Sequence, residues 1–114
     1  MNSFNELKIL SIAKNTLDSV ILSFKIPENL KTVFNFEPGQ YITLEKKIND
    51  KVIRRPYSIC SSPNDNSLKV GIKKVEGGIF STFANQNLKA GDYLKVSNPE
   101  GNFVYKKPYS NSVI

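Results

Sequence analysis

The sequence predicts a small all-β domain, built as a closed barrel of six short strands with a single helix. Apolar and polar residues alternate with a period of two through most of the chain, which is typical of strands with one buried face. Short runs rich in Asn, Asp, Gly and Pro separate these segments and supply the turns. Six strands at this spacing favour a barrel, because closure hides the hydrogen-bonding edges of a sheet.

Each predicted element follows from its own pattern. Every second residue is apolar in 20–26 and in 68–73, so both segments are expected to be strands. Four further strands are expected over Glu6–Ala13, Gln40–Lys46, Val52–Ser61 and Tyr93–Ser97. Only Ser81–Leu88 has the pattern of a helix, after two glycines and before Gly91. Residues 27–36 break the alternation and are expected to form a loop or one helical turn.

Composition limits the chemistry that the chain can perform. The single cysteine, Cys60, excludes a disulfide framework and a four-cysteine zinc or iron–sulfur site within these 114 residues. No histidine is present, so the usual general base and metal ligand are missing, and no metal site is predicted. Any catalysis must therefore depend on a bound cofactor. Cys60 is expected to be a packed thiol without a redox role.

Charge and hydropathy narrow the possible partners. Sixteen Lys and Arg against ten Asp and Glu give a net charge of +6, which suits an anionic ligand, an acidic partner protein or simply a solvated surface. The charges form no long like-charged block, so a nucleic-acid-binding tail is not expected. No apolar run approaches the roughly 20 residues that a membrane span needs, and Met1–Leu10 lacks the pattern of a signal peptide. We therefore expect a cytoplasmic protein without a membrane partner.

The segment that most suggests a binding site is 54–63. Arg55 offers a fixed fork for a phosphate, Tyr57 a flat face for a stacked ring, and Ser58 a small donor or acceptor. In a strand, Arg55 and Tyr57 share one face, and Ser58 lies on the other unless the strand bends. Taken alone, the segment is better explained as an edge strand with an exposed Arg and a half-buried Tyr.

A second candidate segment is the predicted helix start at 77–82. Two glycines precede a Ser-Thr pair there, and the first amides of a helix have no intrahelical acceptors, so they can bind an anion. Ser81 is either the N-cap or a residue of the first turn. Taken alone, an ordinary glycine turn before a capped helix explains this segment better.

Taken together and in order, these segments resemble the flavin-binding domain of the ferredoxin–NADP(+) reductase superfamily. The shared features are Pro38-Gly39-Gln40 at a strand entry, Arg55-x-Tyr57-Ser58, Gly78-x-x-Ser81 at a helix start, Lys89-Ala90-Gly91-Asp92, and Pro99-x-Gly101-x-Phe103. The resemblance covers nearly the whole chain. One departure is Asn98, where many members have glycine. Within the superfamily, 54–63 and 72–92 are most similar to the reductase subunit of the phenylacetyl-CoA oxygenase system.

The resemblance implies a six-stranded antiparallel Greek-key barrel with one short capping helix, and FAD as the cofactor. It implies that Arg55 pairs with the flavin phosphates, that Tyr57 packs on the isoalloxazine or ribityl side, and that Ser58 hydrogen-bonds near the reactive N5. Tyr57 and Ser58 are thus the expected catalytic residues. The other residues expected to bind the cofactor are Pro56, Ile72, Lys73, Gly78, Ile79, Phe80, Ser81 and Thr82.

The resemblance also implies a larger protein. Residues 1–105 are expected to form the FAD-binding domain, and 106–114 to begin a linker or first strand toward an absent NAD(P)-binding domain. The intact protein would pass electrons from NAD(P)H through FAD to a 2Fe-2S centre and an oxygenase component, in phenylacetate catabolism. The fragment alone is expected to be inactive. Two alternatives are a small basic barrel that binds single-stranded nucleic acid and a non-catalytic interaction module.

Overall fold

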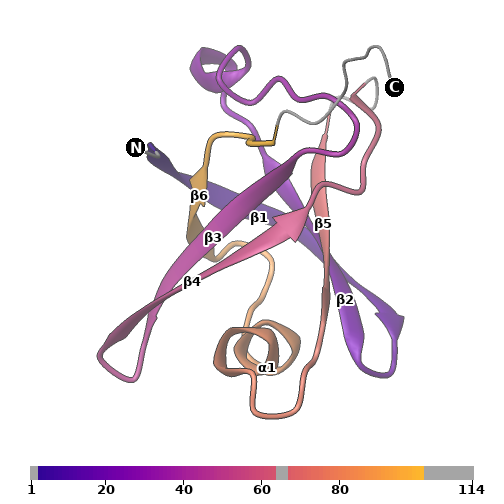
Figure 1. The fold of residues 1–114 in the computed structure, drawn as a ribbon, viewed down its shortest axis with the longest axis vertical. Helices are drawn as coiled ribbons and strands as arrows, with labels where there is room; N and C mark the ends of the chain where they lie inside the picture. The colour runs from indigo at the N-terminus through magenta and orange to yellow at the C-terminus, as the bar shows by residue number, and fades with distance from the viewer. Residues whose placement is uncertain (1–2, 64–66, 102–114) are drawn as a thin grey trace, which may run out of the picture.

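The fold is described by a computed structural model that covers residues 3–63 and 67–101 (Figure 1). Its strands are β1 (Phe4–Thr16), β2 (Ser19–Lys25), β3 (Tyr41–Ile48), β4 (Lys51–Ser58), β5 (Leu68–Lys73) and β6 (Tyr93–Ser97). A 3-10 turn, η1 (Glu28–Leu30), and a helix, α1 (Ile79–Gln86), complete the described elements. The expected domain boundary at 105–106 and the segment 106–114 lie outside the described residues. No helix in the described ranges is long and apolar enough to cross a membrane.

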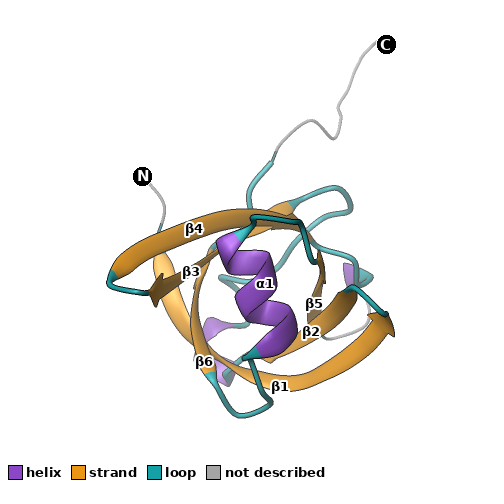
Figure 2. Cartoon of the chain, turned by 90° about the horizontal axis from the view of Figure 1, so that it is seen from below, coloured by secondary structure: helices purple, strands orange, loops and turns teal. Residues whose placement is uncertain are grey.

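The six strands form one antiparallel sheet in the order β4-β3-β6-β1-β2-β5. β6, the last of the described strands, lies between β1 and β3, which is Greek-key connectivity. The sheet curls strongly, so that its strands surround a central space seen end-on in Figure 2. The predicted antiparallel six-stranded fold with one helix is therefore confirmed.

The predicted closure of the barrel is wrong. Within 3–63 and 67–101, the edge strands β4 and β5 are joined by no continuous ladder. The chain just after β4 meets β5 at an isolated bridge between Ile59 and Val70, beside which the Cys60 amide donates to the Lys69 carbonyl oxygen at 2.9 Å. β4 ends at Ser58 rather than Ser61, so too few residues stay extended to build a ladder with β5.

The core lies between the concave face of the sheet and α1. β5 shows the alternation most clearly, because Leu68, Val70 and Ile72 are all buried. Phe80 and Ala84 in α1 and Leu88 just after it form an apolar stripe at a spacing of four residues, and they are 1%, 1% and 8% exposed. α1 lies across the lower opening of the curled sheet (Figure 2), so this stripe seals the core.

Two local features position the site. The β3–β4 hairpin turns through Asn49 and Asp50, whose φ values of 52° and 66° suit a tight two-residue turn that Asn and Asp tolerate. α1 begins at Ile79, two residues before the predicted start, and its N-cap is Gly78. The earlier start places Ile79 and Phe80 on the helix itself.

Candidate functional site

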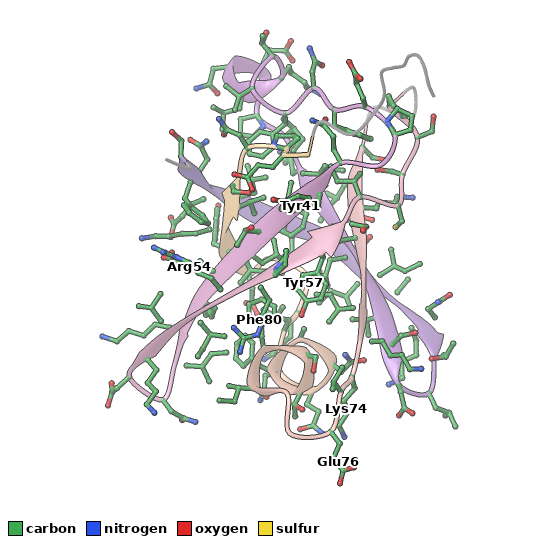
Figure 3. The ribbon with its side chains drawn as sticks, viewed as in Figure 1. Tyr41, Arg54, Tyr57, Lys74, Glu76 and Phe80 are labelled. Atoms are coloured by element: carbon green, nitrogen blue, oxygen red, sulfur yellow. The ribbon has the colours of Figure 1, made fainter. Side chains whose placement is uncertain are left out.

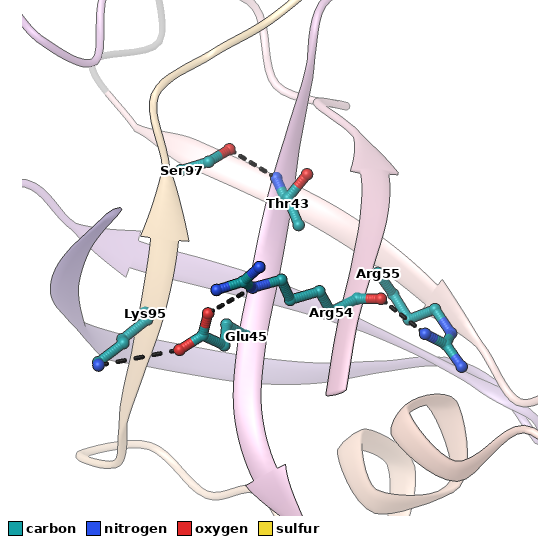
Figure 4. A network of polar contacts seen from close by, with 6 residues as sticks. All are labelled: Thr43, Glu45, Arg54, Arg55, Lys95 and Ser97. Carbon is teal, nitrogen blue, oxygen red and sulfur yellow. Dashed lines mark hydrogen bonds and ion pairs between the residues drawn. The ribbon is translucent and has the colours of Figure 1, made fainter. Parts of the chain in front are cut away.

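Arg54 takes part in a closed set of contacts on the outer side of the sheet (Figure 4). Its Nε donates to Glu45 Oε1 at 2.6 Å, and Lys95 Nζ lies 3.8 Å from Glu45 Oε2. The Arg54 guanidinium also lies over the ring of Phe4, 5.2 Å from its centroid. We call Phe4, Glu45, Arg54 and Lys95 the outer network. The single carboxylate of Glu45 on β3 contacts both cations, Arg54 on β4 and Lys95 on β6.

Arg55, the next residue on β4, has no such partner. Within the described residues its guanidinium donates only to the Arg54 carbonyl oxygen, at 2.7 Å, and no carboxylate pairs with it. Figure 4 shows its side chain on the side of β4 that faces α1. A guanidinium without a counter-charge is suited to a bidentate contact with a phosphate.

Tyr57 links β4 to the first turn of α1. Its half-buried ring lies 5.9 Å from the ring of Phe80, centroid to centroid, at an angle of 44° (Figure 3). Burial raises the pKa of the Tyr57 phenol, and the charge of Arg55 opposes that rise. This interaction agrees with the expectation that Arg55 and Tyr57 share a face of the strand. We call Arg55, Tyr57 and Phe80 the helix-side cluster.

The start of α1 presents amides without intrahelical acceptors. The first helical bond runs from the Thr82 amide to the Gly78 carbonyl oxygen at 3.1 Å, so the amides of 79–81 precede it. Ser81 is a first-turn residue rather than the N-cap. Its buried hydroxyl accepts from the Val75 amide at 3.0 Å and donates to the Gly78 carbonyl oxygen at 3.4 Å. The hydroxyl thus closes the loop before the helix, and the backbone amide is the part of Ser81 left for an anion.

Glycine is needed at 77 and at 78, before α1, for two different structural reasons. Gly77 adopts a φ of +77°, which other residues rarely take. Gly78 has an ordinary φ, but a Cβ there would lie 2.6 Å from Ser81 Oγ and 3.0 Å from the Val75 carbonyl oxygen. The loop therefore packs tightly around Gly78 and leaves the helix start uncovered by a side chain at that position.

A groove of about 610 Å³ runs between the β3–β4 hairpin and the start of α1. One wall consists of Lys47, Ile48 and Asn49, and the other consists of Gly77, Gly78, Ile79, Thr82, Phe83 and Asn87. Three predicted cofactor residues, Gly78, Ile79 and Thr82, therefore share this groove. Lys47 and Asn49 were not predicted, although a lysine next to an Asn-Asp turn was a visible signal of charge at the hairpin.

A second pocket, of about 470 Å³, lies beside Tyr57, between the end of β4 and the start of β3. It contains three predicted residues, Pro56, Tyr57 and Ser58, together with Tyr41, Thr43 and Glu100, which were not predicted. Strand pairing sets this arrangement, because Tyr41 is opposite Ser58 and Thr43 is opposite Pro56 in the β3–β4 register. The Ser58 side chain is exposed in this pocket.

The structure does not bring Ile72 and Lys73 into either pocket. The Ile72 side chain is fully buried and its carbonyl oxygen accepts from Asn85 Nδ2 at 3.2 Å, whereas Lys73 is exposed at the end of β5. Their contact with a cofactor stays a prediction.

Cys60 is exposed, so the expectation of a packed thiol was wrong. Cys60 lies just beyond the end of β4 at Ser58, outside the core.

Comparison with known proteins decides the family. The model of the oxidoreductase FAD-binding domain family matches residues 6–105. The chain belongs to this family. The match confirms the predicted superfamily and FAD as the cofactor.

This FAD-binding domain is similar to parts of longer reductases. It is 35% identical over 106 residues to one subunit of the 1,2-phenylacetyl-CoA epoxidase of Escherichia coli (strain K12), covering 93% of this chain and 30% of the relative. It is 34% identical over 103 residues to the glycine betaine monooxygenase reductase subunit of Pseudomonas aeruginosa (strain UCBPP-PA14), covering 90% and 28%. It therefore spans less than a third of either relative.

A solved structure supports the same family assignment. Phthalate dioxygenase reductase, described as a modular structure for electron transfer from pyridine nucleotides to 2Fe-2S, superposes with a TM-score of 0.76 at 26% identity. The match covers 92% of this chain and 32% of that one.

The described residues fit FAD. The cofactor combines a flat ring system with a diphosphate. The helix-side cluster offers an uncompensated guanidinium and a half-exposed aromatic ring, and the neighbouring helix start offers free amides. The Tyr57–Phe80 contact joins the strand that carries Arg55 to the first turn of α1.

Proposed function

We propose that this chain is the flavin domain of a pyridine-nucleotide-dependent reductase that supplies electrons to an oxygenase through an iron–sulfur centre. The observation that carries the proposal is the helix-side cluster. Arg55, without a carboxylate partner, lies on the same face of β4 as Tyr57, and Tyr57 contacts the first turn of α1. An anionic diphosphate attached to a ring system fits this arrangement.

Bound FAD would supply the hydride-accepting and single-electron chemistry of the reductase. Arg55 and the amides of 79–81 would hold its diphosphate by charge-assisted hydrogen bonds. Tyr57, which contacts Phe80, would pack against the ring. The Ser58 hydroxyl, exposed in the second pocket, would offer a hydrogen bond to the reactive edge of the ring near N5.

The partners follow from the same proposal. NAD(P)-binding and ferredoxin-type domains belong to the same polypeptide, and an oxygenase component receives the electrons; phthalate dioxygenase reductase supports this modular arrangement. We place the protein in the cytoplasm, where NAD(P)H is available. The Escherichia coli relative supports a role in phenylacetate catabolism. The glycine betaine relative, at 34% identity, supports the reductase role without that substrate.

A titration of the flavin-free domain with FAD, followed by flavin fluorescence, tests the proposal. Arg55→Ala should weaken binding by about 1.5–3 kcal/mol, roughly ten- to a hundredfold, because one charge-assisted phosphate contact is lost. Arg54→Ala is the matched control. It removes the same charge from the neighbouring position and should leave the affinity nearly unchanged, because Arg54 is engaged in the outer network.

The FAD affinities of Arg55→Ala and Arg54→Ala distinguish a specific phosphate contact from general attraction of an anion. Equal weakening by both substitutions would indicate general attraction of an anion by a basic protein, and no weakening by Arg55→Ala would remove the phosphate role. A parallel titration with FMN shows whether the adenosine half contributes. No observation on the described residues favours the nucleic-acid alternative.

A further inference from the structure

The second pocket contains a carboxylate whose backbone is held in place by the fold. The Tyr41 amide donates to the Glu100 carbonyl oxygen at 2.9 Å, and the Glu100 amide donates to the Tyr41 carbonyl oxygen at 2.8 Å. Next to this bridge, Gln40 Nε2 donates to the Gly101 carbonyl oxygen at 2.9 Å. The loop after β6 is thus fastened to the start of β3, and the position of Glu100 is determined by the backbone.

The Glu100 carboxylate is not neutralised by a cation. Within the described part of the chain, the ion pairs are those of Glu45, and Glu100 forms none. The negative charge of Glu100 raises the pKa of the Tyr41 phenol, and burial raises it further.

The carboxylate shares its pocket with the two residues expected at the flavin ring. Tyr57 and Ser58 line the same pocket as Glu100, and Ser58 is directly opposite Tyr41 in the strand register. A ring packed against Tyr57 with its N5 edge at Ser58 therefore has the Glu100 carboxylate as a near neighbour.

We propose that Glu100, held against Tyr41, sets the reduction potential of the bound flavin by placing a fixed negative charge beside its reactive edge. The inference rests on the proposed function, since it concerns the ring that Tyr57 and Ser58 are proposed to contact. Two-electron reduction gives the flavin ring negative charge near neutral pH. A nearby carboxylate repels that charge, so it disfavours the reduced ring and lowers the potential.

The test is the midpoint potential of FAD in the wild-type chain and in Glu100→Gln, measured by equilibration with a reference dye. The neutral variant should shift the equilibrium about tenfold toward the reduced form, which is an upward shift of about 30 mV for a two-electron couple. Glu6→Gln is the matched control. It removes one carboxylate from an exposed position on β1, away from the pocket, and should leave the potential unchanged.

A flavin-free measurement checks the geometry independently. In Glu100→Gln the pKa of Tyr41 should fall toward its ordinary value of 10.0, seen as tyrosinate absorbance in an alkaline titration, with Tyr41→Phe identifying the signal. If Glu100→Gln does not fold, Glu100→Ala replaces it, because the bridge to Tyr41 uses only backbone atoms.

The outcomes distinguish the inference from the function on which it rests. If FAD binds with the expected dependence on Arg55 but the potential is the same in Glu100→Gln, the inference is overturned and the proposed function stands. If Glu6→Gln raises the potential as much as Glu100→Gln, the effect is one of net charge and the inference is likewise overturned. If the wild-type chain does not bind FAD, both fail together.

Discussion

Adjacent arginines on β4 have opposite environments. Arg54 belongs to the outer network, where Glu45 accepts its hydrogen bond and Phe4 lies beneath its guanidinium. Arg55 belongs to the helix-side cluster, where the charge has no counter-charge among the described residues. Both side chains are exposed, so exposure alone does not distinguish them.

The two arginines share residue type and exposure and differ only in their partners. The partners therefore decide whether a charged side chain holds strands together or remains available to bind a ligand. A compensated charge ties strands together and has little attraction left for a ligand. An uncompensated charge beside free helix amides adds to the positive potential at one place. The strand's alternation produces this separation, because neighbouring residues must face opposite sides of the sheet.

The largest effect is expected from Phe80→Ala, which removes the support beneath Tyr57 without touching the outer network. Phe80 is 1% exposed, so the variant should lose about 3–5 kcal/mol of unfolding free energy in a urea titration. Ile79→Ala is the control, since Ile79 is 47% exposed and should change stability by only about 0.5 kcal/mol. Similar losses in both variants would show that α1 is not anchored through Phe80.

A smaller effect is expected from breaking the outer network. Arg54→Ala should cost up to about 1 kcal/mol of stability, because the Arg54 side chain is 61% exposed and solvent screens its pairing with Glu45. The loss should shrink at high salt. Arg55→Ala should leave stability nearly unchanged. A larger loss of unfolding free energy in Arg55→Ala than in Arg54→Ala would contradict this difference between the two arginines.

The smallest effect concerns the titration of Tyr57. Its pKa is already raised by burial and held back by Arg55, so Arg55→Ala should raise it further. A raised pKa in the folded state means that the protonated phenol favours folding. Its contribution is complete below pH 10.0, the ordinary value, and is lost as the pH rises through the raised pKa. A tyrosinate absorbance titration, with Tyr57→Phe as reference, measures the shift; an unchanged pKa would show that Arg55 and Tyr57 do not interact.

Local patterns predicted the strands and much of the site. Alternation in 68–73 predicted a strand that the structure has with the same bounds, and the Arg55-x-Tyr57-Ser58 element was placed on a strand correctly. The start of α1 was predicted two residues late, and of the two roles left open for Ser81 the structure shows that of a first-turn residue. Its hydroxyl in fact bonds the Val75 amide, a contact that depends on the path of the preceding loop.

The sequence by itself determined which residues alternate into the core, where the chain turns, and that Arg55, Tyr57 and Ser58 stand together on one strand. Those properties depend on neighbours within a few positions. Only the tertiary structure decided that the sheet stays open between β4 and β5, that Glu45 neutralises Arg54 and not Arg55, and that Glu100 lies beside Tyr41. These outcomes depend on strand order. Gln40 and Gly101 meet although 61 positions separate them, and no local period carries that information.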